Sequence, residues 1–224
     1  MEWQTAQLGD LCEITASPSS DAFDGLSLEA QGTPVLSPPD IDAAGRVDAR
    51  LMRRLPSVPG SLERFRLAPG DVVVVRQGTL GKLALLDGRH LGWLYGSACI
   101  RLRPNRRSVD PAYLASYLAY PPVMDWILSR SNPGTVATIT SETLRSVTVA
   151  FPDLQRQRLI TSALAEIDTQ IEVQQQLLAR LTVLRPAVFA ELLEGHGPHT
   201  RSGIGAAVET QNRVGRTRRS SRLS

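Results

Sequence analysis

Hydrophobic and polar positions follow two different periods along this chain. From Met1 to about Pro152, short apolar and β-branched runs alternate with turns that contain glycine, proline or aspartate, which is typical of strands. From Asp153 to Glu194 the apolar residues recur three and four positions apart, as they do on one face of a helix. The pattern predicts an α+β fold: a mixed globular domain with a β-sheet core over residues 1–152, followed by one long coiled-coil-forming α-helix over residues 153–194.

The first part contains a glycine-rich turn between two predicted strands. The Pro69-Gly70 pair opens a β-branched run over residues 71–76, and a second apolar run covers residues 82–86 after the turn. Further runs predict strands near residues 91–94, 98–102 and 147–150. Asp110-Pro111 has the composition of a helix start, so we expect a helix to about residue 130 with an interruption at Pro121-Pro122, and then a short helix capped by Thr140 or Ser141.

The second part carries a heptad stripe. At about 1.5 Å per residue, a continuous helix over residues 153–194 would be roughly 60 Å long, which is longer than packing against one domain requires. We therefore expect this helix to bind a partner helix, and we expect Pro186 to kink or break it. Residues 195–224 lack any periodicity and are predicted to be a disordered basic tail. The residues expected in the helix interface are Ile160, Leu164, Ile167, Ile171, Leu178 and Leu181, with Gln174 as a polar position in the same stripe.

Composition and charge narrow the function. With 224 residues, 42% hydrophobic and 21% charged, the chain fits one ordinary domain plus an appendage. We find no apolar run of membrane-spanning length and expect a cytoplasmic location with no membrane partner. The net charge is +3, but the last 24 residues contribute +5, so the remainder is about −2. Binding to nucleic acid would therefore depend on a local basic surface and not on the overall charge.

The segments that come nearest to motifs for catalysis, cofactor binding or metal binding differ from those motifs in residue type or spacing. The loop from Gly78 to Lys82 has Arg76 and Leu83 where a phosphate-binding loop needs glycine and a hydroxyl residue. In residues 120–123, Tyr-Pro-Pro-Val, both ends differ from the tetrapeptide with which amino-methyltransferases hold a base. Cys12 and Cys99 have no second ligand at metal spacing, and we expect both to be buried. We predict no catalytic residue, no cofactor and no metal.

Two polar turns carry the side chains best suited to DNA. Arginine, glutamine and asparagine can make paired hydrogen bonds to base edges, and hydroxyl groups contact phosphates. Both turns could equally be ordinary turns whose polar groups are hydrogen-bonded within the protein. Tyr95, in the stretch from Gly92 to Ser97, could equally belong to the core. The candidate DNA-facing set is Arg76, Gln77, Thr79 and Lys82 around the first turn, Arg130, Asn132 and Thr135 around the second, and Tyr95.

The ordered combination of these features resembles the DNA-specificity (S) subunit of type I restriction-modification systems over residues 1–194. The resemblance is carried by Leu8-Gly9-Asp10-Leu11, by the stretch from Gly70-Asp71-Val72 to Gly81-Lys82, and most strongly by the junction at Phe151-Pro152 with Gln155, Gln157 and Ile160. It implies a non-catalytic target recognition domain that binds double-stranded DNA, followed by a spacer helix. The implied partners are N6-adenine DNA methyltransferase subunits and, in full complexes, a restriction subunit.

The chain departs from this family in length, because full-size members carry two recognition domains and two helices. Three explanations stay open: a half-subunit that forms a homodimer through antiparallel helices, a piece that needs a second half-subunit from another gene, and a truncated remnant. A homodimer would recognise an interrupted inverted repeat. A different class of function would also explain the helix: the chain could be a coiled-coil adaptor whose globular head binds protein.

Overall fold

The structure is a computed structural model that describes residues 3–50, 52–132 and 137–194. The chain divides into two compact units, residues 1–164 and residues 165–224. The predicted boundary at residue 152 does not coincide with this division, because the first turns of the long helix pack with the globular unit. The predicted tail at residues 195–224 lies outside the described residues.

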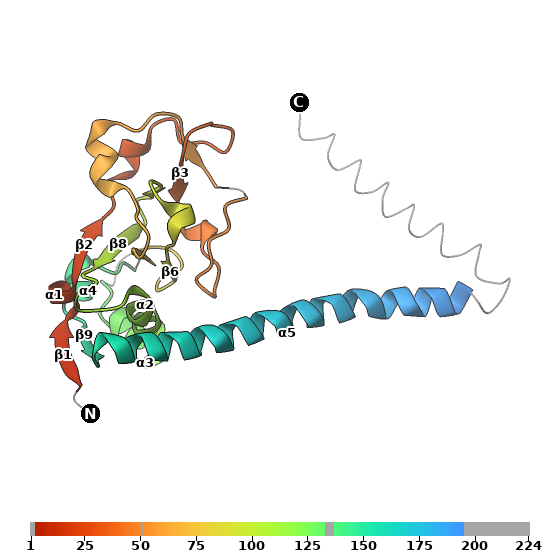
Figure 1. Cartoon of the computed structure of the whole chain (residues 1–224). Coiled ribbons are helices and arrows are strands. Elements are labelled where there is room, and N and C mark those ends of the chain that lie inside the picture. Colours follow the sequence, from red (N-terminus) through yellow and green to blue (C-terminus); the bar gives the residue numbers. More distant parts are fainter. Residues whose placement is uncertain (1–2, 51, 133–136, 195–224) are drawn as a thin grey trace. The chain divides into compact units, whose positions relative to one another are not determined.

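An antiparallel four-stranded sheet lies at the centre of the first unit, with the strand order β2-β8-β5-β6 (Figure 1). Its two inner strands are the β-branched runs that the sequence predicted, shifted by one or two residues at their ends. The sheet therefore confirms the predicted hairpin around the glycine-rich turn. The strands are β2 (Cys12–Ala16), β5 (Val72–Val75), β6 (Leu83–Leu85) and β8 (Cys99–Pro104).

Strand β5 is buried on both faces and belongs to two cores. Val72 and Val74 contact one apolar cluster, which includes helices α2 (Pro111–Ala119) and α3 (Pro121–Ser129). Val73 and Val75 contact a second cluster on the other face of the sheet. A strand with both faces buried has an uninterrupted apolar sequence, which is why four consecutive valines are found here.

Because all four residues are valine, the apolar pattern of β5 does not by itself fix its register with β8. The polar residues that flank the strand do so. Asp71, which is buried, accepts two hydrogen bonds of 2.8 Å from the guanidinium of Arg103, which lies opposite it in the strand pair. At the other end, the backbone N–H of Arg76 donates to Ala98 O at 2.8 Å. Both ends of the pair are thereby held in one register.

Smaller sheets and short helices complete the globular unit. The chain start pairs with the last strand, since β1 (Gln4–Gln7) is antiparallel to β9 (Thr148–Phe151). The predicted interruption between the two middle helices is confirmed, because Tyr120 has extended backbone angles between α2 and α3. Thr140 caps the predicted short helix, as expected. The other elements are α1 (Leu8–Leu11), η1 (Ser20–Phe23), β3 (Thr33–Leu36), η2 (Pro38–Asp40), β4 (Arg54–Leu55), η3 (Gly60–Phe65), η4 (Gly88–His90), β7 (Leu94–Tyr95) and α4 (Ser141–Arg145).

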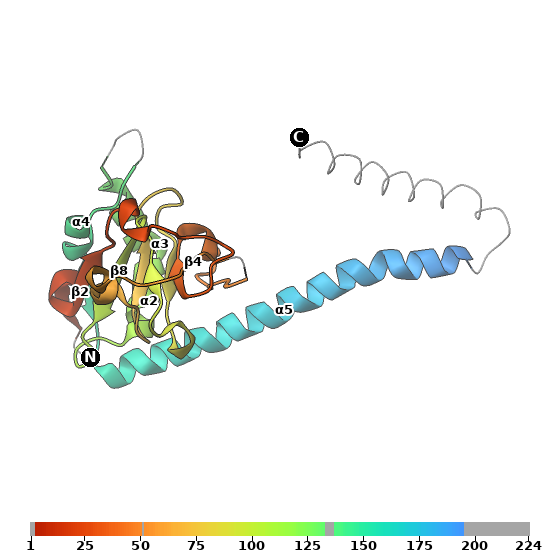
Figure 2. The same ribbon diagram turned by 90° about the horizontal axis from the view of Figure 1, so that it is seen from above.

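The long helix is confirmed as α5 (Leu154–Glu194), and the expected break at Pro186 is wrong. The helix continues through the proline, and both ribbon views show it without interruption (Figures 1 and 2). Proline removes the hydrogen bond that the carbonyl of Thr182 would accept, and its ring crowds that carbonyl. Because Thr182 is exposed, its carbonyl can tilt toward water, which replaces the missing donor. These findings confirm an α+β fold with a long C-terminal helix.

The start of α5 is fixed by one buried amide. Gln157 is fully buried, and its Oε1 accepts a 2.8 Å hydrogen bond from the backbone N–H of Asp110, at the start of α2. Its Nε2 donates to Pro152 O at 2.8 Å, and Ile160, one turn later, packs on the first cluster. The first turns of α5 therefore belong to the fold of the globular unit.

We expect Asp71→Ala to lower the free energy of unfolding by about 2 kcal/mol, measured by urea denaturation. The change removes one partner of a largely buried ion pair, and the value lies below the usual range because Arg103 is 38% exposed. Glu63→Ala is the matched control. It breaks the ion pair with Arg66 on the surface and should hardly change stability. Equal effects of the two substitutions would contradict the role given to Asp71.

We expect Gln157→Leu to cost about 2 kcal/mol in a thermal or urea unfolding experiment. Leucine has a similar volume but leaves the Asp110 N–H and the Pro152 carbonyl without their partner in the interior. Gln155→Leu, at an exposed position on the same turn, is the control and should leave the midpoint near that of the unmodified chain. An unchanged midpoint for Gln157→Leu would show that the amide does not hold the helix start.

Candidate nucleic-acid interface

Polar segments meet at one end of the central sheet, which we call the sheet end. Arg76 and Gln77 follow β5 there, Ser97 and Ala98 precede β8, and Lys82 precedes β6. The Nε of Arg76 donates to Ser97 O at 3.1 Å, so the arginine side chain crosses toward the neighbouring strand. Antiparallel pairing brings these residues together because alternate strands enter and leave the sheet at the same end.

The glycine-rich turn between β5 and β6 extends from the sheet end. Gly78 and Gly81 have φ angles of 81° and 80°, a region that favours glycine, so the turn depends on both of them. A Cβ on Gly81 would also lie 2.7 Å from the sulfur atom of Met124 in α3. Thr79 lies between the two glycines and is exposed. The turn is thus compact on its α3 side and presents its tip to solvent.

The second predicted turn packs directly against the first. The backbone N–H of Ile139 donates to Arg76 O at 3.0 Å, and the amide Nε2 of Gln77 donates to Thr138 Oγ1 at 3.3 Å. The N–H of Asn132 in turn donates to Thr138 O at 3.0 Å, and Asn132 is exposed. Two turns that are more than fifty residues apart in the sequence therefore form one hydrogen-bonded surface. Thr135 lies outside the described residues.

Arg130 follows α3 and stacks on an aromatic ring. Its guanidinium carbon lies 3.9 Å from the centre of the Trp126 ring, and Arg130 is exposed. Stacking on an aromatic face restricts the rotamers of arginine while leaving its N–H groups at the edge of the plane. Arg130 can therefore present a preorganised positive group beside Asn132.

Lys82 has a supporting role as well as a charge. Its Nζ donates to Ile41 O at 3.0 Å, and the side chain is half-buried. This bond ties the start of β6 to the segment that follows η2. Lys82 therefore lies at the sheet end, but its ammonium group already donates a hydrogen bond to the protein backbone.

Tyr95 is the candidate that the structure contradicts. The residue is fully buried in the second apolar cluster, and its hydroxyl donates to Thr15 O at 3.2 Å. Burial also raises the pKa of its hydroxyl, and the ring packs edge-on against Phe65. Tyr95 therefore stabilises the core and cannot contact DNA in this structure. The flanking glycines did not distinguish an exposed aromatic residue from a buried one.

A cleft beside the sheet end is lined by residues that no sequence pattern singled out. It has a volume of about 350 Å³, and one of its lining residues is Arg53, an exposed residue just before β4. Arg53 stands in a stretch with no turn motif or glycine signal, and only the pairing of β3 with β4 brings it here. The cleft is lined by Ser20, Phe23, Leu26, Ser37, Pro38, Pro39, Arg53, Gly96, Ser97 and Ala98.

Other classes of site find no support in the described part of the chain. No group of three or more histidine, cysteine, aspartate or glutamate residues is placed to hold a metal ion among the described residues. Cys12 and Cys99 are buried as expected, and burial raises the pKa of both thiols to about 12. No described helix is both long enough and apolar enough to span a membrane.

Comparison with known proteins identifies the family. The model of the type I restriction modification DNA specificity domain matches residues 1–183. The EcoBI specificity subunit of Escherichia coli is 22% identical over 190 residues, which cover 83% of this chain and 38% of that protein. The crystal structure of the HsdS subunit from Thermoanaerobacter tengcongensis has a TM-score of 0.56 at 23% identity, covering 78% of this chain and 39% of that one. The S subunit from M. genitalium has a TM-score of 0.54 at 14% identity, with 77% and 40% covered.

The chain therefore spans about 40% of the length of the relatives that it matches. Within that span, the match includes the globular unit and most of the long helix. By the family model that covers most of its residues, this chain belongs to the type I restriction modification DNA specificity domain family.

Proposed function

We propose that this chain recognises a specific sequence in double-stranded DNA through its sheet end, as the non-catalytic specificity subunit of a type I restriction-modification complex. The observation that carries the proposal is the hydrogen-bonded joining of the two polar turns at that end, through Arg76, Gln77 and Thr138. A surface formed by segments from distant parts of the chain is held rigidly, as recognition of base edges requires.

The side chains at the sheet end suit both kinds of DNA contact. Arg76 uses its Nε for Ser97, which leaves further N–H groups of its guanidinium to bind an acceptor. Arginine forms paired hydrogen bonds with guanine, and asparagine and glutamine form them with adenine. Thr79 and Arg130 are exposed and suited to phosphate contacts, which position a protein on the duplex. The proposed set is Arg76, Gln77, Thr79, Lys82, Arg130, Asn132 and Thr135.

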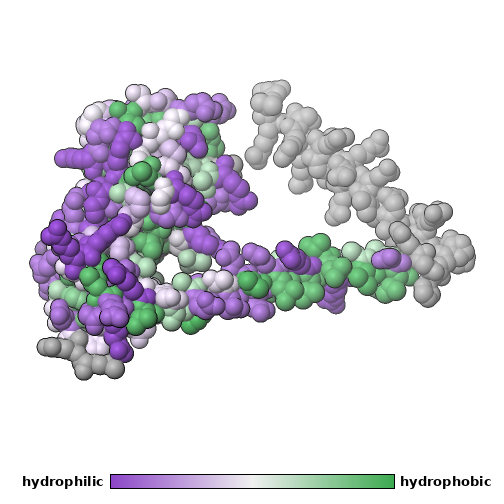
Figure 3. All heavy atoms as spheres, viewed as in Figure 1, coloured by the Kyte–Doolittle hydropathy of each residue, from purple (hydrophilic) through white to green (hydrophobic). Residues whose placement is uncertain are grey.

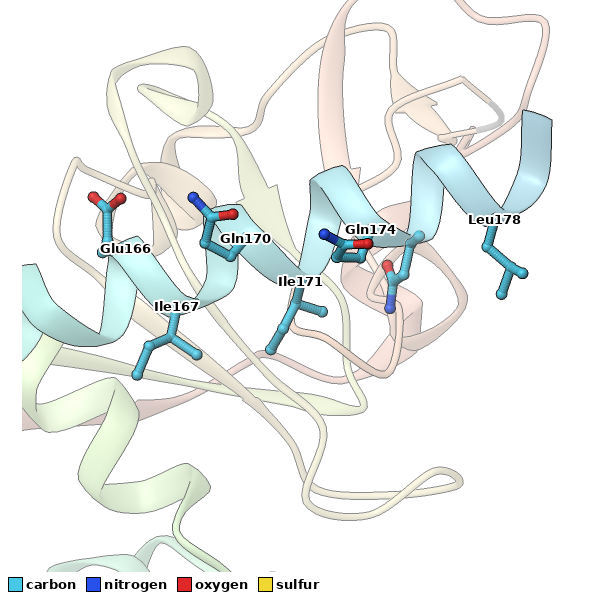
Figure 4. Close-up of a pocket in the computed structure, with 7 residues that line it drawn as sticks. Glu166, Ile167, Gln170, Ile171, Gln174 and Leu178 are labelled. Carbon is cyan, nitrogen blue, oxygen red and sulfur yellow. The ribbon is translucent and has the colours of Figure 1, made fainter. Parts of the chain in front are cut away.

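The second unit supports self-association. The side chains of α5 over residues 165–193 are exposed, with Ile171 at 50% and Leu178 at 66%. Figure 3 shows hydrophobic residues gathered along the helix, and Figure 4 shows Ile167, Ile171 and Leu178 projecting to one side, away from Glu166 and Gln170. Exposure of this apolar stripe to water is unfavourable, and a partner helix would shield the stripe from water.

The stripe is almost symmetric about Gln174. Ile171 and Leu178 flank it at three and four positions, and Ile167 and Leu181 lie seven positions away on either side. An antiparallel second copy would therefore pair apolar residues with apolar residues and place the two Gln174 amides together. A homodimer of this kind has a twofold axis, so its two recognition domains would bind an interrupted inverted repeat. We propose DNA methyltransferase subunits, and a restriction subunit in full complexes, as the further partners.

We expect Arg76→Ala and Arg130→Ala each to weaken binding to a duplex by roughly 5- to 150-fold, as expected for loss of about 1–3 kcal/mol of contact energy. The measurement is a salt titration of binding to fluorescent duplex DNA. Loss of a phosphate contact should also reduce the salt slope by about 1. A chain that ends at Gly195 should be measured in parallel, because residues 201–224 carry six arginines.

Arg107→Ala is the control for these substitutions. Arg107 is exposed and follows β8 at the opposite end of the sheet, so its loss should leave DNA affinity unchanged. The proposal fails when Arg76→Ala and Arg130→Ala both keep the affinity and salt slope of the unmodified chain. Absence of salt-dependent DNA binding would favour the protein-adaptor function instead.

We expect the unmodified chain to be a dimer in light scattering and the double variant Ile171→Glu, Leu178→Glu to be a monomer. Two glutamates in the stripe would place charges in an apolar helix interface. The matched control is Thr169→Glu, Gln176→Glu, which adds the same charges on the other side of α5 and should remain dimeric. A monomeric unmodified chain would contradict the homodimer and favour a second half-subunit or a remnant.

A further inference from the structure

The cleft beside the sheet end is lined by polar and apolar groups in similar measure. Phe23, Leu26 and Pro38 supply carbon surface, and Phe23 is nearly buried. The hydroxyl of Ser37 is turned inward and donates to Val35 O at 3.3 Å. At about 350 Å³ the cleft is at the small end of the range for ligand sites, so it suits one flat group rather than an extended ligand.

Arg53 is the charged side chain of this cleft, and its guanidinium is sparsely bonded. Its Nη2 donates a long hydrogen bond of 3.5 Å to Ser37 Oγ, and none of the ion pairs found among the described residues includes Arg53. Burial raises the pKa of nearby Asp40, while the Ser37 N–H and the charge of Arg53 act in the opposite direction. Since a guanidinium has five N–H donors, Arg53 can still donate two parallel bonds.

The cleft continues the proposed DNA interface. Ser97 lines it, and the carbonyl of the same residue accepts the bond from Arg76 Nε. Gly96, which also lines the cleft, donates its N–H to Leu36 O at 2.8 Å, next to Ser37. Arg53 and Arg76 are therefore both adjacent to one backbone segment, residues 96–98.

The chemistry around Arg53 favours a base edge over a phosphate. Asp21 and Asp24 line a hollow that adjoins the cleft and shares Ser20, Phe23 and Leu26 with it. Carboxylates in the adjoining hollow disfavour a phosphate, and the carbon surface of the cleft would leave phosphate oxygens poorly solvated. A base edge carries no net charge, tolerates apolar contact and, in guanine, presents two acceptors that match the arginine fork.

We propose that Arg53 recognises a guanine of the target site from this cleft, as a specificity-determining residue that adds to the sheet end. The inference rests on the proposed function. It distinguishes Arg53 from residues that only position the duplex, because its loss should change which sequence is bound and not how strongly DNA is bound in general.

The test is selection of a target from a random duplex library by the full chain, followed by the same selection with Arg53→Ala. We expect the unmodified chain to select a site containing a guanine that Arg53→Ala no longer prefers, with roughly 5- to 150-fold weaker binding of the selected duplex. Binding of random duplex and the salt slope should be unchanged. Replacing the preferred guanine by 7-deazaguanine, which lacks N7, should weaken binding of the unmodified chain and have no effect on Arg53→Ala.

Two further variants keep the result interpretable. Arg53→Lys retains the charge and can donate to guanine O6 or N7 but lacks the planar fork, so it should keep only part of the guanine preference. If Arg53→Ala weakens binding to all duplexes alike and lysine restores that binding, the contact is to phosphate and the proposal is overturned. Arg50→Ala is the control, because Arg50 is exposed and paired with Asp48, and it should select the wild-type site. A site that Arg53→Ala selects equally well overturns this inference alone, whereas an unmodified chain that selects no sequence overturns the proposed function as well.

Discussion

The ion pair between Asp71 and Arg103 is the constraint on which the rest of this structure depends. A one-residue slip of β5 against β8 would exchange the two faces of four valines, and either arrangement would be equally apolar. A buried carboxylate, however, requires its partner, so only the register that places Asp71 opposite Arg103 is stable. That register also determines which residues extend beyond the other end of the strand pair.

The ion pair and the proposed recognition surface lie at opposite ends of the same two strands. Asp71 and Arg103 lie at one end of the β5–β8 pair, and Arg76 and Ser97 lie at the other. The buried strands between them hold the two ends at a fixed separation and are not themselves accessible to a ligand. Polar loops on a rigid sheet can vary in sequence without changing the core, which suits a domain family whose members are expected to recognise different DNA sequences.

The long helix shows the same separation along its own axis. Its first turns are part of the globular unit, because Gln157 and Ile160 contact groups of that unit. Farther along, Ile171 and Leu178 have no apolar neighbour outside the helix among the described residues of the second unit, and they are exposed. Helix propensity alone gives little stability to such a segment in water, and the proposed partner helix would stabilise it by covering the stripe.

The sequence by itself determined the α+β class, the hairpin around the glycine-rich turn, the split between α2 and α3 and the length of α5, since each of these depends on local periodicity, proline or capping residues. It did not determine that Tyr95 is buried, that α5 continues through Pro186, or that Arg53 and Ser97 line one cleft. Those outcomes depend on which strands pair and which surfaces meet water. Pairing between distant segments is a property of the tertiary structure, so no local pattern could have shown it.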